Sequence, residues 1–176
     1  MPTTEELLSR QSPHSPEAEQ SVLGSMLIDS RCVNEVVGIV RPDDFYLQTN
    51  RDIYETIYEM FSYSQVIDPV TVLDKMRERG VFDEQNSAKY LMQLMEVTPT
   101  AANVKQYALI VHDKALLRKL SDTASGIIDT VYEGAGTAQD ILEAAEKRIF
   151  ALRRGSTNDS LEHIGTILLS VFDRLT

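Results

Sequence analysis

The segment from residue 102 to 132 contains no proline, and Gly126 is its only glycine. An uninterrupted run of this kind predicts one α-helix of about 30 residues, roughly 45 Å long at about 1.5 Å per residue. Nowhere in the chain do apolar and polar residues alternate for long enough to suggest a β-sheet. The predicted fold class is therefore all-α.

A second helix is predicted to run back along the first. Gly134 and Gly136 mark a turn, and Thr137 followed by Asp140 resembles a capping box for the return helix. Residues 101–154 thus predict an antiparallel helical hairpin. The apolar residues of the return helix share one face and are Ala138, Ile141, Leu142, Ala145, Ile149 and Leu152.

Two helices packed side by side cannot bury all of their own apolar side chains. Those of the first helix spread over a face wider than one partner helix covers, and Phe150 projects roughly 80° outside the main stripe of the return helix. A second hairpin packed alongside would bury them, so we predict dimerisation; burial by the N-terminal globule is the alternative. The predicted self-association residues are Leu116, Leu117, Leu120, Ile127, Ile128, Val131 and Phe150.

Residues 155–176 predict a linker and an amphipathic linker helix. A polar break over residues 155–160 comes first, and Asp159 followed by Glu162 supplies a capping box. The apolar residues that follow recur at three- and four-residue steps, so they form one face of a helix. A tethered apolar stripe needs a receiving groove on another protein surface. Its predicted docking face is Leu161, Ile164, Leu168, Val171, Phe172 and Leu175.

Residues 16–100 predict a globule of short helices, preceded by a flexible polar arm over residues 1–15. Ser15 followed by Pro16 predicts the start of the first helix. Asp68 followed by Pro69 predicts the start of a later helix, which Gly80 ends. The apolar residues expected inside these helices are Val22, Leu23, Met26, Leu27, Val33, Val36, Val37, Val40, Ile53, Ile57, Met60, Phe61, Val72, Leu73, Met76, Tyr90, Leu91, Leu94 and Met95.

The charge of the chain argues against binding of duplex DNA or of an anionic membrane. Acidic residues outnumber basic ones by 27 to 17, which gives a net charge of −10. The one cysteine, Cys32, cannot form an internal disulfide, and we expect a buried, inert thiol. The N-terminus has no secretory signal, and no stretch approaches the ~20 apolar residues that span a bilayer. A cytoplasmic location is expected.

The sequence offers no catalytic, cofactor-binding or metal-binding residues. Neither GxxxxGK[ST] nor GxGxxG occurs, so no phosphate loop is predicted. The three histidines lack partners at ligand spacing, and we expect His112 and His163 on the solvent side or at an interface. Asp43 and Asp44 follow Pro42, where they suit turn and capping roles better than acid–base or metal chemistry.

Basic residues gather in two places. For the cluster in the return helix, Lys147, Arg148, Arg153 and Arg154, interaction with a helix C-terminus is the simpler interpretation. A docking patch for an acidic partner or for single-stranded nucleic acid is the alternative. A weaker basic group lies on the long helix and consists of Lys114, Arg118 and Lys119.

Four motifs together resemble a known family. PEAEQSVLG at 16–24 closely resembles the opening of the bacterial replicative DNA helicases of the DnaB family. RPDDFY at 41–46, IDPVTV at 67–72 and TPTAANV at 98–104 fall in the order and spacing of that family's N-terminal domain. Residues 107–118 resemble the start of its hairpin. The resemblance extends from about residue 12 to the end of the sequence.

This resemblance implies a helical globule, a hairpin and a linker helix. Paired hairpins would make a collar of three dimers in a hexamer, and the linker helix would pack on the RecA-like domain of the neighbouring subunit. Primase would dock on the collar, and a helicase loader is a further expected partner. DNA would bind this part weakly if at all. ATP and magnesium belong to the motor of the 5′-to-3′ helicase, which this sequence lacks, so we expect a fragment that ends in or just after the linker helix.

Other functional classes stay open at this point. A stand-alone adaptor that binds a helicase or a primase is the main alternative. A helicase-binding domain of a primase would require a polymerase module upstream. An enzyme that acts on its own is the weakest hypothesis, because no catalytic motif supports it.

Overall fold

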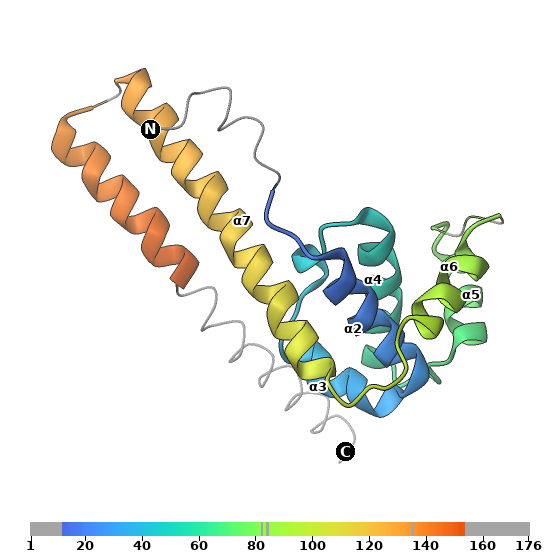
Figure 1. The fold of residues 1–176 in the computed structure, drawn as a ribbon. Coiled ribbons are helices and arrows are strands. Elements are labelled where there is room, and N and C mark those ends of the chain that lie inside the picture. The colour runs from blue at the N-terminus through green and yellow to red at the C-terminus, as the bar shows by residue number, and fades with distance from the viewer. Residues whose placement is uncertain (1–11, 82, 84, 135, 154–176) are drawn as a thin grey trace, which may run out of the picture.

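The structure is a computed structural model that describes residues 12–81, 83, 85–134 and 136–153 (Figure 1). Within these residues every regular element is helical and no strand occurs, so the all-α prediction is confirmed. In chain order the labelled elements are α2 (Pro16–Ile28), η1 (Ser30–Cys32), α3 (Val33–Val37), η2 (Pro42–Asp44), α4 (Gln48–Ser62), α5 (Pro69–Glu78), α6 (Ser87–Glu96) and α7 (Val104–Glu133). A helix over residues 138–153, here called the return helix, follows α7.

Helix α2 is the central helix of the globule, where it contacts α4, α6 and α7. It begins at Pro16 as predicted, because the Ser15 hydroxyl accepts a hydrogen bond from the Ala18 N–H at 3.3 Å. Proline suits the next position because the nitrogen there needs no hydrogen-bond partner. The core around α2 contains most of the predicted apolar residues: Val22, Leu23, Met26, Leu27, Val33, Val36, Val37, Val40, Ile53, Ile57, Met60, Val72, Met76, Leu91 and Leu94.

Helix α5 also begins and ends where the sequence signals predict. The Asp68 carboxylate accepts hydrogen bonds from the backbone N–H groups of Val70 and Thr71, at 2.8 and 3.0 Å. The Thr71 hydroxyl in turn accepts one from the Asp68 N–H, which completes a capping box. Gly80, two residues beyond the helix, has a φ of 71°, the left-handed conformation that favours glycine after a helix.

A buried carboxylate that the sequence analysis did not single out connects α2 to α4. Glu19 is buried, and it accepts hydrogen bonds from the N–H groups of Tyr46 and Leu47 and from the Asn50 side chain. These donors lie at the N-terminus of α4, whose own N-cap residue, Leu47, has no capping side chain. Glu19 therefore caps α4 from another helix, with its negative charge at the positive end of the helix dipole.

Helix α7 belongs to two parts of the molecule at once. Its first three turns lie in the globule, where Val104, Ala108, Val111 and Ala115 are buried. Beyond these turns α7 extends away from the globule, and only the return helix lies beside it among the described residues (Figure 1). Its 30 residues agree with the predicted length of about 30.

The return helix runs back along the outer part of α7. The turn between them contains Gly134 and Gly136 at φ 64° and 104°. The Thr137 hydroxyl accepts a hydrogen bond from the Asp140 N–H at 3.3 Å, and the Asp140 carboxylate accepts one from the Thr137 N–H at 2.8 Å. The predicted capping box is thus present.

Gly24 is required by the close approach of α2 to the end of α6. A Cβ at Gly24 would stand 2.2 Å from the Thr98 Oγ1 and 2.3 Å from the Leu94 carbonyl oxygen. At Gly126 in α7, an added Cβ would meet only the Arg148 Nη1, at 3.4 Å. A backbone carbonyl cannot move aside as the end of an arginine side chain can.

We expect Gly24→Ala to lower the free energy of unfolding by about 1–3 kcal/mol, because the methyl group overpacks the contact between α2 and α6. Gly126→Ala is the matched control, and a gain of about 0.5–1 kcal/mol is expected from helix propensity. Urea unfolding followed by circular dichroism measures both. Equal effects of the two substitutions would contradict the close packing at Gly24.

Candidate protein–protein interface

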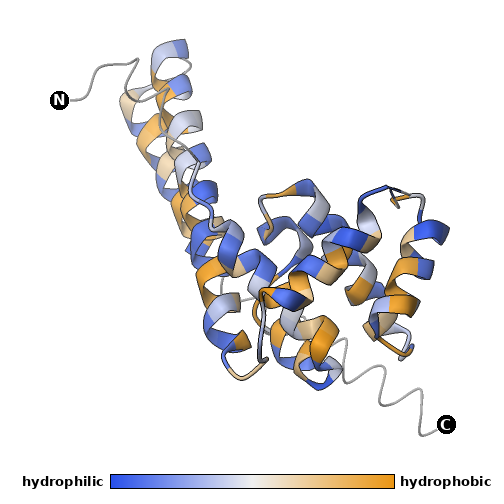
Figure 2. Cartoon of the chain, turned by 45° about the vertical axis from the view of Figure 1, so that its right-hand side comes forward, coloured by the Kyte–Doolittle hydropathy of each residue, from blue (hydrophilic) through white to orange (hydrophobic). Residues whose placement is uncertain are grey.

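Large apolar side chains are exposed along the hairpin beyond the globule. Ile128 on α7 and Phe150 on the return helix have 55% and 58% of their surface exposed. By the 100° step of a helix, the exposed apolar residues of outer α7 lie roughly opposite those that pack on the globule. Figure 2 shows hydrophobic stretches along the hairpin where it stands away from the globule.

The residues predicted for self-association differ in how exposed they are. Leu117, Leu120, Ile128, Val131 and Phe150 are exposed, whereas Leu116 and Ile127 are half-buried. The N-terminal globule, the alternative cover, does not bury any of these seven side chains fully. Their role in self-association stays a prediction. Further apolar residues of the two hairpin helices, not predicted for self-association, are exposed as well, namely Leu109, Ile110, Tyr132, Leu142 and Ile149.

The second predicted surface lies outside the described residues. It is the docking face of the linker helix, made of Leu161, Ile164, Leu168, Val171, Phe172 and Leu175. His163 and Arg154 lie outside them too.

A buried carboxylate, Asp44, fixes the hairpin to the globule. Its side chain is only 2% exposed, and it accepts a hydrogen bond from the Arg41 N–H at 3.0 Å. That bond is the capping role predicted for Asp44. The Lys119 ammonium on α7 donates to the other carboxylate oxygen at 3.1 Å, and the His112 Nδ1 lies 3.5 Å from Oδ2. Two side chains of α7 thus converge on one carboxylate of η2.

The pKa values at this junction are shifted in opposite directions. The hydrogen bond to Asp44 raises the pKa of His112 above its usual 6.5, against the opposing effect of burial. Burial by itself raises the pKa of Asp44, but hydrogen bonds from His112 and the Arg41 N–H, together with Lys119, bring it below its usual 3.8. Both shifts favour the charged forms, as expected for an ion pair.

The end of the N-terminal arm is held at the same junction. The Arg118 guanidinium donates a hydrogen bond to the Pro13 carbonyl oxygen at 2.8 Å and another to the Asp44 carbonyl oxygen. It also lies 5.6 Å from the centre of the Tyr46 ring, on which the His14 ring stacks at 4.3 Å. Residues 12–15, expected to be part of a flexible arm, are therefore attached to α7.

Two basic residues make contacts that the simplest expectations did not include. His112, expected on the solvent side or at an interface, is half-buried against Asp44. Arg148 does not interact with a helix C-terminus. Its guanidinium donates instead to the Gly126 carbonyl oxygen at 3.0 Å and to the Thr130 hydroxyl at 3.3 Å, so it joins the two helices of the hairpin.

The described residues offer no site for metal chemistry or for a reactive thiol. Among them, no three His, Cys, Asp or Glu side chains come together as possible metal ligands. Burial raises the pKa of Cys32 to about 11, so the thiol stays protonated at neutral pH. None of the helices in the described part is both long enough and apolar enough to cross a bilayer.

Comparison with known proteins identifies what this arrangement is similar to. The family model described as "DnaB-like helicase N terminal domain" matches residues 11–113. The replicative DNA helicase DnaB of Pasteurella multocida is 33% identical over 166 residues, which cover 93% of this chain and 36% of that protein. The chain therefore spans little more than a third of the length of this relative.

Two solved structures share the fold. The N-terminal domain of DnaB helicase from Mycobacterium tuberculosis superposes with a TM-score of 0.74 at 34% identity, and the match covers 80% of this chain and 99% of that one. The N-terminal domain of DnaB helicase from Helicobacter pylori, described with its interactions with primase, gives a TM-score of 0.57 at 22% identity. The second match covers 66% of this chain and 90% of that one.

The ion pair between Asp44 and His112 predicts a specific dependence of stability on pH. The contribution of His112 is complete below its usual pKa of 6.5 and is lost as the pH rises through the raised value. The contribution of Asp44 is lost only when the pH falls from 3.8 through the lowered value. The pair should therefore stabilise the fold most between about pH 4 and 6.5.

Urea unfolding of the wild-type chain and of His112→Gln, at one pH inside this window and at one well above it, tests the assignment. We expect the difference in unfolding free energy between the two proteins to be larger inside the window, by up to about 1 kcal/mol for a half-buried pair. A difference that does not change with pH would show that His112 acts through packing alone.

Proposed function

Because the chain belongs to the DnaB-like helicase N-terminal domain family, we propose that it forms the collar and the partner-docking part of a hexameric replicative DNA helicase. The longer protein would unwind DNA 5′ to 3′ in the bacterial cytoplasm with an ATP-driven motor that lies outside residues 1–176. The function proposed for this part is assembly and docking rather than catalysis.

The exposed apolar face of the hairpin is the observation that carries the assembly proposal. Its large side chains come from both helices, and neither helix nor the globule covers them. Each such side chain gains about 1.5–3 kcal/mol when it is fully buried, so several together can offset the cost of association. A second hairpin in antiparallel contact presents the same face and buries both.

The rigid junction at Asp44 supports the same proposal. A collar requires that every subunit present its hairpin at the same angle to its globule. The buried packing of α7 between Val104 and Ala115 sets that angle, and the Asp44 ion pairs hold α7 at His112, within this packing, and at Lys119, one turn beyond it. A hairpin on a flexible joint would form a less regular ring.

Primase is the proposed partner of the collar. This step rests on the relative from Helicobacter pylori, whose N-terminal domain is described with its interactions with primase. The linker helix would dock on the neighbouring motor domain, and a helicase loader is a further proposed partner. DNA is proposed to bind this part weakly if at all, because acidic residues outnumber basic ones.

A stand-alone adaptor that binds a helicase or a primase is the alternative function. The reading frame beyond residue 176 separates the two hypotheses. A downstream GxxxxGK[ST] motif would identify the helicase, because that loop holds nucleotide phosphates in its motor. A stop codon directly after residue 176 would favour the adaptor.

We expect the wild-type chain to dimerise and the double variant Ile128→Ser, Phe150→Ser to be monomeric, because the substitutions remove two large apolar contacts from the proposed interface. Light scattering over a series of concentrations measures the mass, and circular dichroism checks the fold. Met92→Ser removes an equally exposed apolar side chain from the globule and should leave the dimer intact. A monomeric wild type at high concentration would refute the assembly proposal.

We also expect Leu168→Ser combined with Phe172→Ser to loosen the full-length hexamer while this fragment keeps its fold. The sequence predicts that these residues belong to a linker helix, whose apolar face is proposed to bind a neighbouring subunit. Native mass spectrometry and thermal unfolding of the full-length variant provide the measurement. A hexamer of unchanged mass and thermal stability would count against a docking role of this face.

A further inference from the structure

The connection between α4 and α5 has a backbone conformation that is fixed and locally strained. Ser64 has a φ of 53°, and among the described residues it is the one residue other than glycine with a positive φ. The Gln65 N–H donates to the Met60 carbonyl oxygen at 2.9 Å, and the Thr71 hydroxyl donates to the Val66 carbonyl oxygen at 2.9 Å. The left-handed residue and the Gln65-to-Met60 hydrogen bond form a C-terminal cap of α4, and this cap fixes the direction in which the chain leaves the helix.

Two aliphatic side chains, one in this connection and one in the first turn of α5, are exposed to solvent. Val66 and Val70 are 72% and 75% exposed, and both line one hollow of about 380 Å³ between the end of α4 and α5. Tyr63, at the end of α4, is equally exposed. A loop without a partner would gain by turning valines inward, whereas here the hydrogen bonds around Val66 keep it outward.

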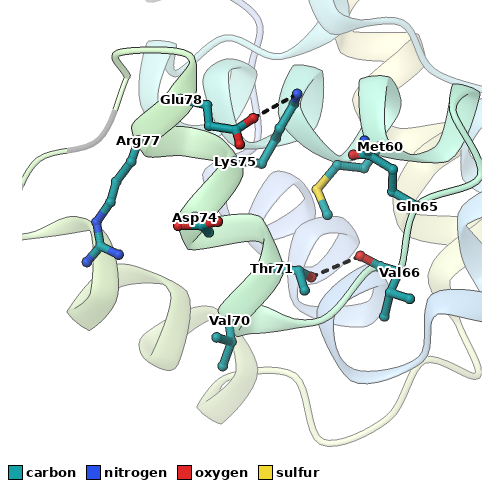
Figure 3. Close-up of a pocket in the computed structure, with 9 residues that line it drawn as sticks. All are labelled: Met60, Gln65, Val66, Val70, Thr71, Asp74, Lys75, Arg77 and Glu78. Atoms are coloured by element: carbon teal, nitrogen blue, oxygen red, sulfur yellow. Dashed lines mark hydrogen bonds and ion pairs between the residues drawn. The ribbon is translucent and has the colours of Figure 1, made fainter.

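The charges around the hollow leave one carboxylate without a partner. The Lys75 ammonium lies 3.1 Å from carboxylate oxygens of both Glu59 and Glu78, so its charge is compensated. Arg77 extends away from Met60 and Gln65, which form the opposite side of the hollow (Figure 3). Asp74 lies between these residues, and it has no hydrogen-bond or ion-pair partner within the part of the chain that the structure describes.

We propose that the hollow bounded by Val66, Val70 and Asp74 is a docking site for a protein segment that carries a lysine or arginine next to an aliphatic side chain. The aliphatic side chain covers the two valines, and the cation pairs with the Asp74 carboxylate. The volume is at the lower end of the ~300–1,000 Å³ typical of ligand pockets, so it accepts one or two side chains rather than a cofactor.

The charge at the site also decides the class of partner. A nucleic acid would bring phosphates against the Asp74 carboxylate, which is unfavourable, whereas a cation placed at Asp74 is attracted. The site lies on the globule and includes no residue of the hairpin. Its lining residues are therefore separate from those proposed for self-association.

Selection from a random peptide phage library on the wild-type chain tests the proposal. We expect the selected peptides to combine a cation with an aliphatic residue and to shift the amide resonances of residues 66–74. Asp74→Lys should weaken their binding about tenfold, and a peptide with glutamate in place of its cation should prefer this variant to wild type. Asp122→Lys, an equal charge change at an exposed site on α7, should leave binding unchanged.

Val70→Ser tests the apolar half of the site separately and should weaken the same peptides. Circular dichroism verifies that each variant is folded. The proposal is overturned if no peptide is enriched, if the enriched peptides lack a cation, or if they bind Asp74→Lys as tightly as wild type. Resonance shifts confined to the hairpin would overturn it as well, and they would leave the self-association proposal untouched.

Discussion

The constraint on which this structure depends is that α7 is longer than the globule that packs against it. Small and β-branched residues, from Val104 to Ala115, let its first turns enter the core closely. Contacts with the globule continue to Lys119, but α7 itself continues to Glu133. One return helix can cover only part of a cylinder, so apolar surface on the outer turns stays exposed. Because α7 is so long, its first turns complete the core of the globule while its outer turns leave apolar side chains exposed.

Two buried carboxylates hold helices of this arrangement in place. Glu19 supplies acceptors for N–H groups at the start of α4, where the local sequence offers no capping side chain. Asp44 gathers a lysine and a histidine of α7 at the point where the helix leaves the globule. A buried charge is tolerated only where it is paired or hydrogen-bonded, so each carboxylate fixes the position of the helix that satisfies it.

Local signals predicted much of the fold, whereas contacts between distant residues could not be predicted. Ser15 with Pro16, and Asp68 with Pro69, act within one turn, and both start helices where expected. Glu19 accepts hydrogen bonds from residues about 27 positions away, which the local sequence does not predict. Its place on the apolar stripe of α2, three residues before Val22, could nevertheless have indicated that it is buried. His112 gave no such signal, because its partner lies 68 residues earlier. The exposed surface of the hairpin could be inferred only from helix periodicity. The hollow at Val66 depends on a backbone conformation that no local sequence motif predicts.

The exposed surfaces of the hairpin and of the globule differ in chemistry, and this difference matches the two functions proposed for them. The outer hairpin presents large apolar side chains from both of its antiparallel helices, which would suit a permanent contact between identical copies. The hollow beside α5 presents two valines and one unpaired carboxylate, a small mixed surface of the kind that binds reversibly and selects by charge. An apolar face that must be covered cannot also remain available to a transient partner. A domain that assembles and recruits, as proposed here, would therefore need two surfaces, and the Asp44 ion pairs join the helix that carries one of them to the globule that carries the other.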